Sequence, residues 1–270
     1  MTIPSEPQRR FPDAREDLEQ SDRVPGTPQT LDPSYRLAFS DADFLTREEL
    51  RPVRLQLELL KTEMALAERG IASTVVMFGS ARIHDPATGA GGATAALGRY
   101  YEEAREFARL CAIRALATGN REGVVCTGGG PGIMEAGSRG AAEAGGISIS
   151  LNIVLPHEQT PNIYGTPDLS FNFHYFAVRK MHFLMRARAI AVFPGGFGTL
   201  DELFEVLTLV QSGRMRRLPI LLFGEEFWTE VVDWQALADA GTIAPEDIGL
   251  FSFADSAAQA VALIDDWPAP

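Results

Sequence analysis

Three apolar runs in this chain each end in a glycine-bearing loop, and a helical pattern follows each of them. The loops are Gly79-Ser80, Gly128–Gly132 and Gly195–Gly198. Apolar runs that alternate with helical patterns predict an α/β domain built on a parallel sheet, with helices on both faces. Ligands of such a sheet bind at the carboxyl ends of its strands. We therefore expect the three loops to meet at one binding site.

The spacing of apolar residues predicts strands and helices in alternation along this domain. Strands are expected at 74–78, 123–126, 147–151, 169–173, 189–193 and 218–223. Helices are expected near 93–118, 133–144, 175–187, 203–210, 225–239 and 255–265. A glycine-rich loop at 89–92 leads into the first of these helices, and a polar loop that contains proline covers 155–168.

The chain has 270 residues, enough for one large domain with an N-terminal addition. Residues 1–40 are rich in proline and charged residues without periodicity, which predicts a flexible arm. Residues 41–70 predict a helical extension that ends at Gly70, and residues 71–270 form the α/β domain. At the start of the extension, Thr46-Arg-Glu-Glu49 has the spacing of a capping box. An apolar stripe at helical spacing is expected to pack on the main fold or on a second subunit: Val53, Leu57, Leu60 and Met64.

Charge and composition argue against several classes of partner. The net charge is −12, from 24 basic and 36 acidic residues, which disfavours binding to nucleic acid or to an anionic membrane. No apolar run approaches the roughly 18–20 residues of a membrane span, and the N-terminus lacks a signal-peptide core, so a cytoplasmic location is expected. Cys111 and Cys126 are expected to be buried thiols rather than a disulfide or a metal site.

The third loop belongs to the motif Pro194-Gly-Gly-Phe-Gly-Thr-Leu-Asp-Glu202, which follows an expected strand. Its glycines let the backbone turn and expose N–H groups, which together with the dipole of the next helix favour a phosphate. The hydroxyl of Thr199 suits a phosphate oxygen, and Asp201 and Glu202 are expected in the first turn of the helix. The alternative is a capping box, in which Glu202 bonds back to the backbone. Spacing alone leaves both interpretations open.

The helix expected before the fifth strand carries a row of basic residues. Arg179, His182 and Arg186 lie at positions i, i+3 and i+7, which places them on one face. A solvated charged face is the ordinary explanation of such a row. The functional explanation puts Arg179 near the phosphate loop, where its planar guanidinium would grip a phosphate or a developing anion.

The second loop, Gly128-Gly-Gly-Pro-Gly-Ile-Met-Glu135, has the make-up of another anion or ribose cradle. Tight turns between strands and helices need glycine anyway, so this loop alone is weak evidence. Glu135 either complements the helix dipole or accepts a hydrogen bond from a ribose hydroxyl. The chain has neither a P-loop nor the Gly-x-Gly-x-x-Gly pattern of dinucleotide-binding folds, and its four histidines show no metal-binding spacing.

Taken together, these motifs resemble the LOG (LONELY GUY) family, whose members are often labelled lysine decarboxylases. The resemblance rests on Phe78-Gly-Ser-Ala-Arg82, on the second loop, and on Arg179-Lys-Met181 followed by Pro194–Glu202. It covers about residues 73–240, and the N-terminal extension resembles the longer bacterial branch. The resemblance implies a Rossmann-like, doubly wound homodimer. Its implied activity is hydrolysis of the N-glycosidic bond of nucleoside 5′-monophosphates, AMP or cytokinin nucleotides, to a free base and ribose 5-phosphate.

The resemblance also implies roles for individual residues. Arg179 and Glu202 match the catalytic pair of the family, in which a carboxylate near C1′ stabilises positive charge on the sugar and orients water. The phosphate loop of the family is matched by Gly195, Gly196, Gly198 and Thr199. Further substrate contacts are expected from Ser80, Gly129, Gly130, Glu135 and Lys180. No cofactor and no metal is implied, and the loop at 155–168 is expected to shape the base pocket.

Other functions compete with this hypothesis. A non-catalytic carrier or sensor of a phosphorylated ligand needs only the phosphate loop, so the additional pair of Arg179 and Glu202 argues against it. A decarboxylase that uses pyridoxal phosphate needs a lysine, and the chain contains two, Lys61 and Lys180. No cofactor-binding pattern surrounds Lys180. Nucleic-acid binding has neither a basic stripe nor base-stacking motifs in its support.

Overall fold

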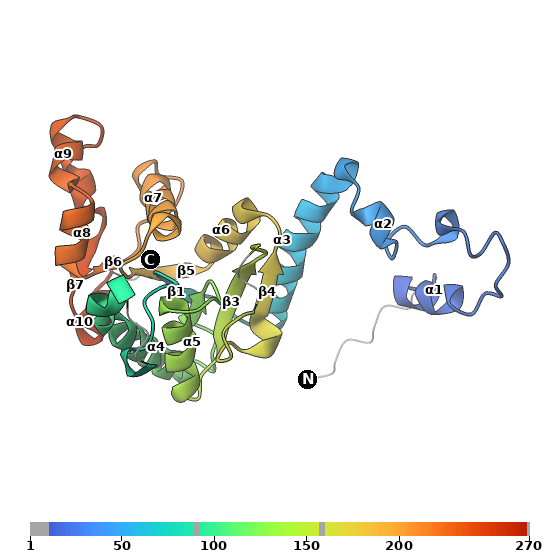
Figure 1. Ribbon diagram of the computed structural model, residues 1–270, viewed down its shortest axis with the longest axis horizontal. Helices are drawn as coiled ribbons and strands as arrows, with labels where there is room; N and C mark the ends of the chain where they lie inside the picture. The colour runs from blue at the N-terminus through green and yellow to red at the C-terminus, as the bar shows by residue number, and fades with distance from the viewer. Residues whose placement is uncertain (1–10, 89–91, 157–159, 269–270) are drawn as a thin grey trace. The chain divides into compact units, whose positions relative to one another are not determined.

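The computed structural model describes residues 11–88, 92–156 and 160–268 (Figure 1). The chain divides into two compact units, Met1–Leu57 and Glu58–Pro270, and the division falls within helix α3 (Arg51–Glu68). The second unit holds the whole sheet and every residue with an expected catalytic or binding role. Parts of two expected loops, 89–91 and 157–159, lie outside the described residues.

A single parallel sheet of seven strands forms the centre of the second unit, in the order β4-β3-β2-β1-β5-β6-β7. Its strands are β1 (Thr74–Phe78), β2 (Val124–Thr127), β3 (Ser148–Ile153), β4 (Ser170–Phe173), β5 (Ala187–Val192), β6 (Ile220–Phe223) and β7 (Ser252–Ala254). The six expected strands are confirmed, with bounds that differ by at most two residues at either end. The spacing does not predict β7, because three residues are too few to show a period.

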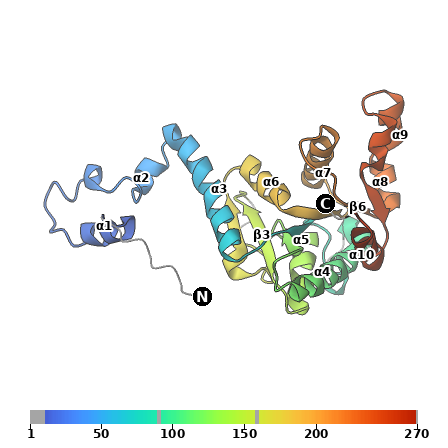
Figure 2. The same ribbon diagram turned by 180° about the vertical axis from the view of Figure 1, so that it is seen from behind.

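Helices cover both faces of this sheet, which confirms the α/β, Rossmann-like class (Figures 1 and 2). On one face, Phe107 of α4 packs edge-on against Phe193 and Phe223. On the other face, Phe183 of α6 packs edge-on against Phe78 of β1, with 5.0 Å between the ring centroids. The helices of this layer structure are α4 (Arg99–Ala117), α5 (Ile133–Glu143), α6 (Phe176–Met185), α7 (Phe197–Gln211), α8 (Glu225–Val231), α9 (Trp234–Asp239) and α10 (Ala257–Asp265).

Three of the expected helices differ clearly from the observed ones, and one of them is α7, which begins at Phe197 rather than near residue 203. The segment expected as one helix at 225–239 forms α8 and α9, because Asp233 caps a new helix and its side chain accepts a hydrogen bond from the Ala236 N–H. The helix expected from 93 begins later, as α4 at Arg99. A 3-10 helix, η4 (Gly92–Leu97), precedes it.

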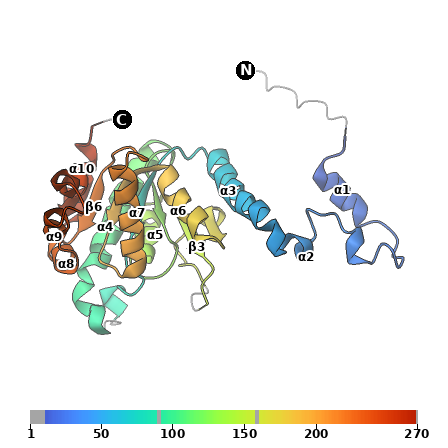
Figure 3. The same cartoon turned by 90° about the horizontal axis from the view of Figure 1, so that it is seen from above.

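The strand order reverses between β1 and β5, so the chain winds outward from this point in both directions. The loops that follow these two strands are joined by backbone hydrogen bonds. Phe193 donates to the carbonyl of Phe78 at 2.8 Å, and Ser80 donates to the carbonyl of Pro194 at 3.1 Å. Ligands of doubly wound sheets bind at such a switch point. Helices α6 and α7 run side by side next to it (Figure 3).

The first unit contains short helices, α1 (Ala14–Ser21) and α2 (Ala42–Leu45), and the 3-10 helices η1 (Pro33–Tyr35) and η2 (Glu48–Leu50). Helix α1 lies in the segment expected as a flexible arm, and none of its residues is buried. The capping box expected at Thr46 is wrong, since Thr46 closes α2 and the chain enters α3 through η2.

Helix α3 confirms the helix expected before Gly70, which has a φ of 69°. The apolar stripe at Val53, Leu57, Leu60 and Met64 is exposed in this chain. The buried residues of α3 are instead Thr62 and Leu66. The face of α3 that carries Glu58 and Glu63 lies against α6, because both carboxylates contact residues at the ends of that helix.

Candidate active site

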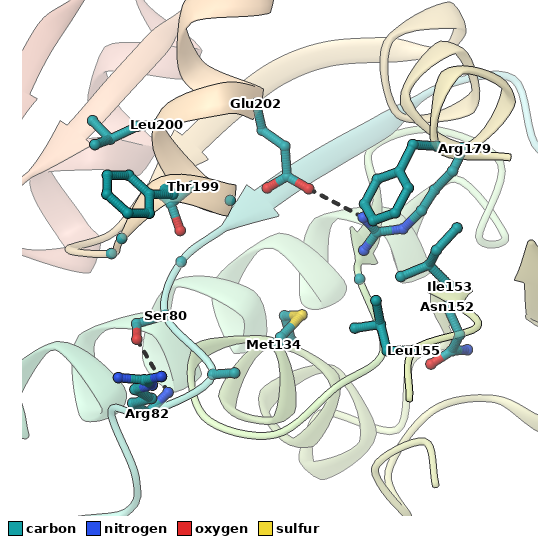
Figure 4. A pocket seen from close by; sticks show the side chains of 18 of the residues that line it. Ser80, Arg82, Met134, Asn152, Ile153, Leu155, Arg179, Thr199, Leu200 and Glu202 are labelled. Carbon is teal, nitrogen blue, oxygen red and sulfur yellow. Dashed lines mark hydrogen bonds and ion pairs between the residues drawn. The ribbon is translucent and has the colours of Figure 1, made fainter. Parts of the chain in front are cut away.

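One large cavity lies at the switch point between β1 and β5, outside the carboxyl ends of the strands (Figure 4). Its volume of about 1070 Å³ is ample for a nucleotide-sized ligand. The loops after β1 and β5, the start of α7, and parts of α6 and β3 line it. Among the expected site residues, those that line this cavity are Ser80, Arg179, Gly195, Gly196, Gly198, Thr199 and Glu202.

The loop after β5 leaves bare backbone at the start of α7. Gly195 is required by close packing, because a Cβ at this position would lie 2.1 Å from Oγ1 of Thr199. At Gly196 and Gly198, by contrast, a Cβ would meet no atom within 4 Å, and neither residue has a positive φ. These two glycines therefore leave the backbone open to a ligand, and no sharp turn requires them. An anion can approach the N–H groups of a helix N-terminus through such a gap.

Thr199 lies in the first turn of α7 and is buried, with 5% of its surface exposed. It makes no capping hydrogen bond, and its hydroxyl oxygen faces the cavity (Figure 4). Buried hydroxyl groups normally have hydrogen-bond partners. A hydroxyl in this position can bond an anion that sits at the helix N-terminus.

The capping-box interpretation of Glu202 is wrong. Helix α7 begins at Phe197 with Gly196 as its N-cap residue, and no side chain caps it. Glu202 and Asp201 therefore stand in the second turn, not in the first turn as expected. Because residues three apart share one face of a helix, Glu202 faces the same cavity as Thr199.

Arg179 is buried, which contradicts the interpretation of its helix face as a solvated one. Its Nε donates to the backbone carbonyl of Leu151 at 2.7 Å, and its Nη1 lies 3.3 Å from Oε1 of Glu202. A Cβ on Gly128 would lie 2.5 Å from Nη2 of Arg179. The glycine after β2 thus leaves room for the guanidinium in the position from which it contacts the carboxylate.

Helix α6, which carries Arg179, is anchored at both ends by α3. At its start, the carboxylate of Glu58 accepts hydrogen bonds from the backbone N–H groups of residues 174–175, at 2.7 and 3.2 Å. At its end, Glu63 forms an ion pair with Arg186. Helix α6 has no side-chain cap of its own, and the carboxylate from α3 binds the N–H groups of its N-cap residue, Tyr175, and of the residue before it.

The carboxyl group of Glu202 has an unusual electrostatic environment. Burial raises its pKa from 4.5 to about 7, the guanidinium of Arg179 opposes this change, and the neighbouring Asp201 adds to it. The distance of 3.3 Å to Arg179 is longer than the roughly 2.7–2.9 Å of a strong charge-assisted hydrogen bond. A carboxyl group that titrates near neutral pH is suited to proton exchange with a bound molecule.

Lys180 does not line the cavity as the structure describes it, although it follows Arg179 directly. Its Nζ lies 3.2 Å from both carboxylate oxygens of Asp201 and 3.0 Å from Oε2 of Glu205. Burial by itself lowers the pKa of Lys180, but the hydrogen bonds to Glu205 and Asp201 outweigh burial and raise it. The ammonium is therefore held, as a cation, between α6 and α7.

Gly129, Gly130 and Glu135 also lie outside the described lining of the cavity. The carbonyl groups of both glycines accept hydrogen bonds from the Asn162 side chain, at 3.0 and 3.1 Å. Glu135 accepts a hydrogen bond from the buried hydroxyl of Tyr101 at 2.8 Å. These partners give the three residues a role in shaping the loop. Their expected contacts with substrate stay predictions.

Several polar residues of the cavity were not expected as site residues, and Arg82 and Asn152 are two of them. Arg82, in the loop after β1, is exposed and lines the cavity near Ser80, whose Oγ accepts the Arg82 backbone N–H at 3.1 Å (Figure 4). Asn152 lines the cavity near the carboxyl end of β3. A polar residue at the carboxyl end of a parallel strand is the sequence signal that would have indicated both. Leu155, Thr160 and Pro161 also contribute, so the loop at 155–168 reaches the cavity.

The described residues offer no group of three or more potential metal ligands. No helix within the described ranges is long and apolar enough to cross a bilayer.

Comparisons with known proteins agree with the motifs of this site. A family model described as "Possible lysine decarboxylase" matches residues 134–264, which include both Arg179 and Glu202. The chain is 27% identical over 147 residues to "Cytokinin riboside 5'-monophosphate phosphoribohydrolase LOG7" of Arabidopsis thaliana. That match covers 53% of this chain and 66% of the relative, just under two thirds of its length.

Solved structures with a related chain trace include two proteins that handle molybdenum cofactor. A molybdenum cofactor binding protein from Rippkaea orientalis is 18% identical, with a TM-score of 0.49, and the match covers 72% of this chain and 95% of that one. A molybdenum cofactor carrier protein from Chlamydomonas reinhardtii is also 18% identical, with a TM-score of 0.46 and coverages of 72% and 96%. Likeness at this level does not bear on activity.

Proposed function

We propose that this chain acts as the LOG family it resembles does, and hydrolyses the N-glycosidic bond of nucleoside 5′-monophosphates, AMP or cytokinin nucleotides; the family model and the plant relative support the proposal. The observation that carries the proposal is the placement of Thr199 and Glu202. They lie one turn apart on α7 and line the same cavity, so an anion cradle and a carboxylate share one ligand site. The distance of one turn suits a sugar phosphate, whose phosphate and C1′ are separated by the ribose ring.

The proposed reaction uses groups that the cavity already brings together. The C1′–N bond breaks and its electron pair leaves on the base nitrogen, while positive charge builds on the sugar. The carboxylate of Glu202 stabilises this charge and accepts a proton from the water whose oxygen bonds to C1′. Arg179, held by the carbonyl of Leu151, donates a hydrogen bond to the departing base. A proton from solvent then completes the free base.

The phosphate is bound at the start of α7 in this proposal. The N–H groups beside Gly196 and Gly198 and the hydroxyl of Thr199 contact its oxygens, and the helix dipole favours its charge. Ser80 faces the same cavity from the loop after β1. The single charged side chain that reaches the cavity from this loop is Arg82, among the residues described there.

A lysine decarboxylase activity has less support, in spite of the description that the family model carries. Lys180 makes contacts with Asp201 and Glu205 and is not part of the described cavity lining, where a Schiff base would have to form. Lys61 is an exposed residue of α3. Neither position brings a lysine amine to the anion cradle.

The homodimer and the cytoplasmic location stay predictions. The exposed apolar stripe of α3, defined above, supports the first of them, because such a stripe on a helix is usually covered by a partner.

A panel of nucleoside monophosphates tests the proposed function. The purified protein is incubated with AMP, GMP, CMP, UMP and a cytokinin nucleotide, and free base and ribose 5-phosphate are quantified. Release of both products from at least one nucleotide is expected. Tight binding of nucleotides without release of base would favour the carrier or sensor instead. Absence of both binding and turnover would contradict the proposal.

A further inference from the structure

Helices α6 and α7 face each other through a cluster of five charged side chains next to the cavity. Arg179 pairs with Glu202, and Lys180 contacts Asp201 and Glu205. Asp201 and Glu205 are four residues apart and so share one face of α7. The cluster thus contains two cations and three carboxylates, so both cations are paired.

Lys180 is the more buried partner in its contacts. Its side chain is 20% exposed, while those of Asp201 and Glu205 are 57% and 33% exposed. The lysine therefore fills the space between the two helices, one residue away from Arg179. It contacts both carboxylates and is not part of the described cavity lining.

The charge balance around Glu202 depends on this lysine. The charged groups that act on Glu202 are Arg179 and Lys180 from α6, and Asp201 and Glu205 from α7. Arg82, the charged group of the β1 loop, lies across the cavity (Figure 4). Without Lys180, Asp201 and Glu205 would face Glu202 uncompensated, and like charges favour the protonated carboxyl.

We propose that Lys180 is a positioning residue, which keeps Glu202 ionised by neutralising Asp201 and Glu205 and does not bind the substrate. The inference deepens the proposed function and rests on it for its consequence in catalysis. The electrostatic part concerns the protein alone. It can therefore be measured whether or not nucleotides are cleaved.

The test is a pH titration of the Glu202 carboxyl carbon by NMR, in full-length protein labelled with ¹³C-glutamate and assigned with Glu202→Gln. In Lys180→Met, the midpoint is expected to rise by about one pH unit, the low end of the effect of a neighbouring charge. The triple variant Lys180→Met/Asp201→Asn/Glu205→Gln should return it toward the wild-type value. Lys61→Met, at the other lysine of the chain, is the matched control and should leave the midpoint unchanged.

Turnover supplies an independent readout. In Lys180→Met, the acid limb of the kcat/KM profile should shift to higher pH together with the NMR midpoint, and activity should recover at higher pH. A raised KM at every pH, without a shift of the limb, would overturn the proposal and show a substrate contact. So would an unchanged NMR midpoint.

Two further outcomes remain distinguishable. If Lys180→Met does not fold, Asp201→Asn/Glu205→Gln keeps the lysine and should move the midpoint of Glu202 downward; no movement there would overturn the proposal. If wild-type protein cleaves no nucleotide, the proposed function fails, but the NMR titration still decides the role of Lys180.

Discussion

Thr199 and Glu202 stand one helical turn apart on α7, and both side chains face the cavity at the switch point of the sheet. The same short segment therefore supplies an anion cradle and a carboxylate. Arg179 reaches Glu202 from α6, at 3.3 Å, and Gly128 leaves room for its guanidinium, since a Cβ there would lie 2.5 Å from Nη2. The site is thus built from three strand ends that are far apart in the chain.

Glu202→Gln is expected to keep the fold and to reduce kcat by about 10²–10⁴-fold, the usual effect of losing a group that exchanges protons. The amide can still accept a hydrogen bond from Arg179, but it cannot accept a proton from water. Release of adenine from AMP measures the loss, and thermal unfolding checks the fold. Full activity in this variant would remove Glu202 from its proposed role.

The rate should depend on pH with an acid limb near pH 7. Burial raises the pKa of Glu202 to about 7, so the carboxylate required by the mechanism is lost as pH falls through that value. A profile of kcat/KM for AMP between pH 5 and 9 measures the limb. A flat profile across pH 6–8 would contradict the assignment.

The titration of Glu202 should also affect the stability of the fold, which is expected to fall with rising pH whereas the rate rises. The folded-state pKa of about 7 lies above the ordinary 4.5, so folding favours the protonated form, and this contribution is lost as pH rises from 4.5 to 7. Glu202→Gln removes the titration. The Tm of the variant minus that of wild type should therefore increase between pH 5 and pH 8, and a constant difference would argue against a buried, titrating carboxyl.

Thr199→Val is expected to raise KM for nucleoside monophosphates by about 10–100-fold, because a hydrogen bond to a charged group contributes about 1.5–3 kcal/mol. Thr208→Val on the same helix is the matched control. Its hydroxyl donates to the carbonyl of Phe204 at 2.7 Å and is exposed, so kinetics should not change. Equal effects of both substitutions would indicate a general perturbation of α7.

Gly198→Ala should separate stability from function. A Cβ there meets no atom within 4 Å, so alanine within the helix is expected to stabilise the fold by about 0.4–1 kcal/mol. The same methyl group intrudes on the anion cradle and should raise KM. Chemical denaturation and steady-state kinetics measure the two effects. An unchanged KM would place the phosphate elsewhere.

Gly128→Ala is expected to abolish most activity by displacing Arg179, whose Nη2 would lie 2.5 Å from the new Cβ. Gly249→Ala is a suitable control, because its Cβ would meet nothing within 4 Å and it lies outside the cavity. Activity of Gly128→Ala near the wild-type level would show that the position of Arg179 is not critical.

Periodicity located the elements well where they are long. The strands that end in glycine loops have bounds close to those expected, whereas β7 was missed, because three residues show no period. The spacing predicts one helix at 225–239, although Asp233 starts a second one. Local signals of this kind identify an element but not a short interruption within it.

The spacing of residues predicts the burial of individual side chains less well than it predicts strands and helices. The row of Arg179, His182 and Arg186 has the spacing of a solvated face, yet Arg179 and His182 are buried. The stripe of apolar residues on α3 does not pack on the rest of the described chain, and its packing on a second subunit stays a prediction. Which side of a helix is covered depends on what lies next to it in space, and spacing carries no information about that.

By itself, the sequence determined the parallel α/β sheet and the three glycine loops at its carboxyl edge, because these follow from local periodicity and residue type. The pairing of Arg179 with Glu202 was implied by the resemblance to the LOG family, since spacing alone left the role of each residue open. Only the tertiary structure decided that Glu202 faces the cavity rather than capping α7, and that Lys180 is held by Asp201 and Glu205 outside the cavity lining. Both outcomes depend on how α7 packs against α6, because distance and burial between separate elements set the partners and the pKa of each charged group.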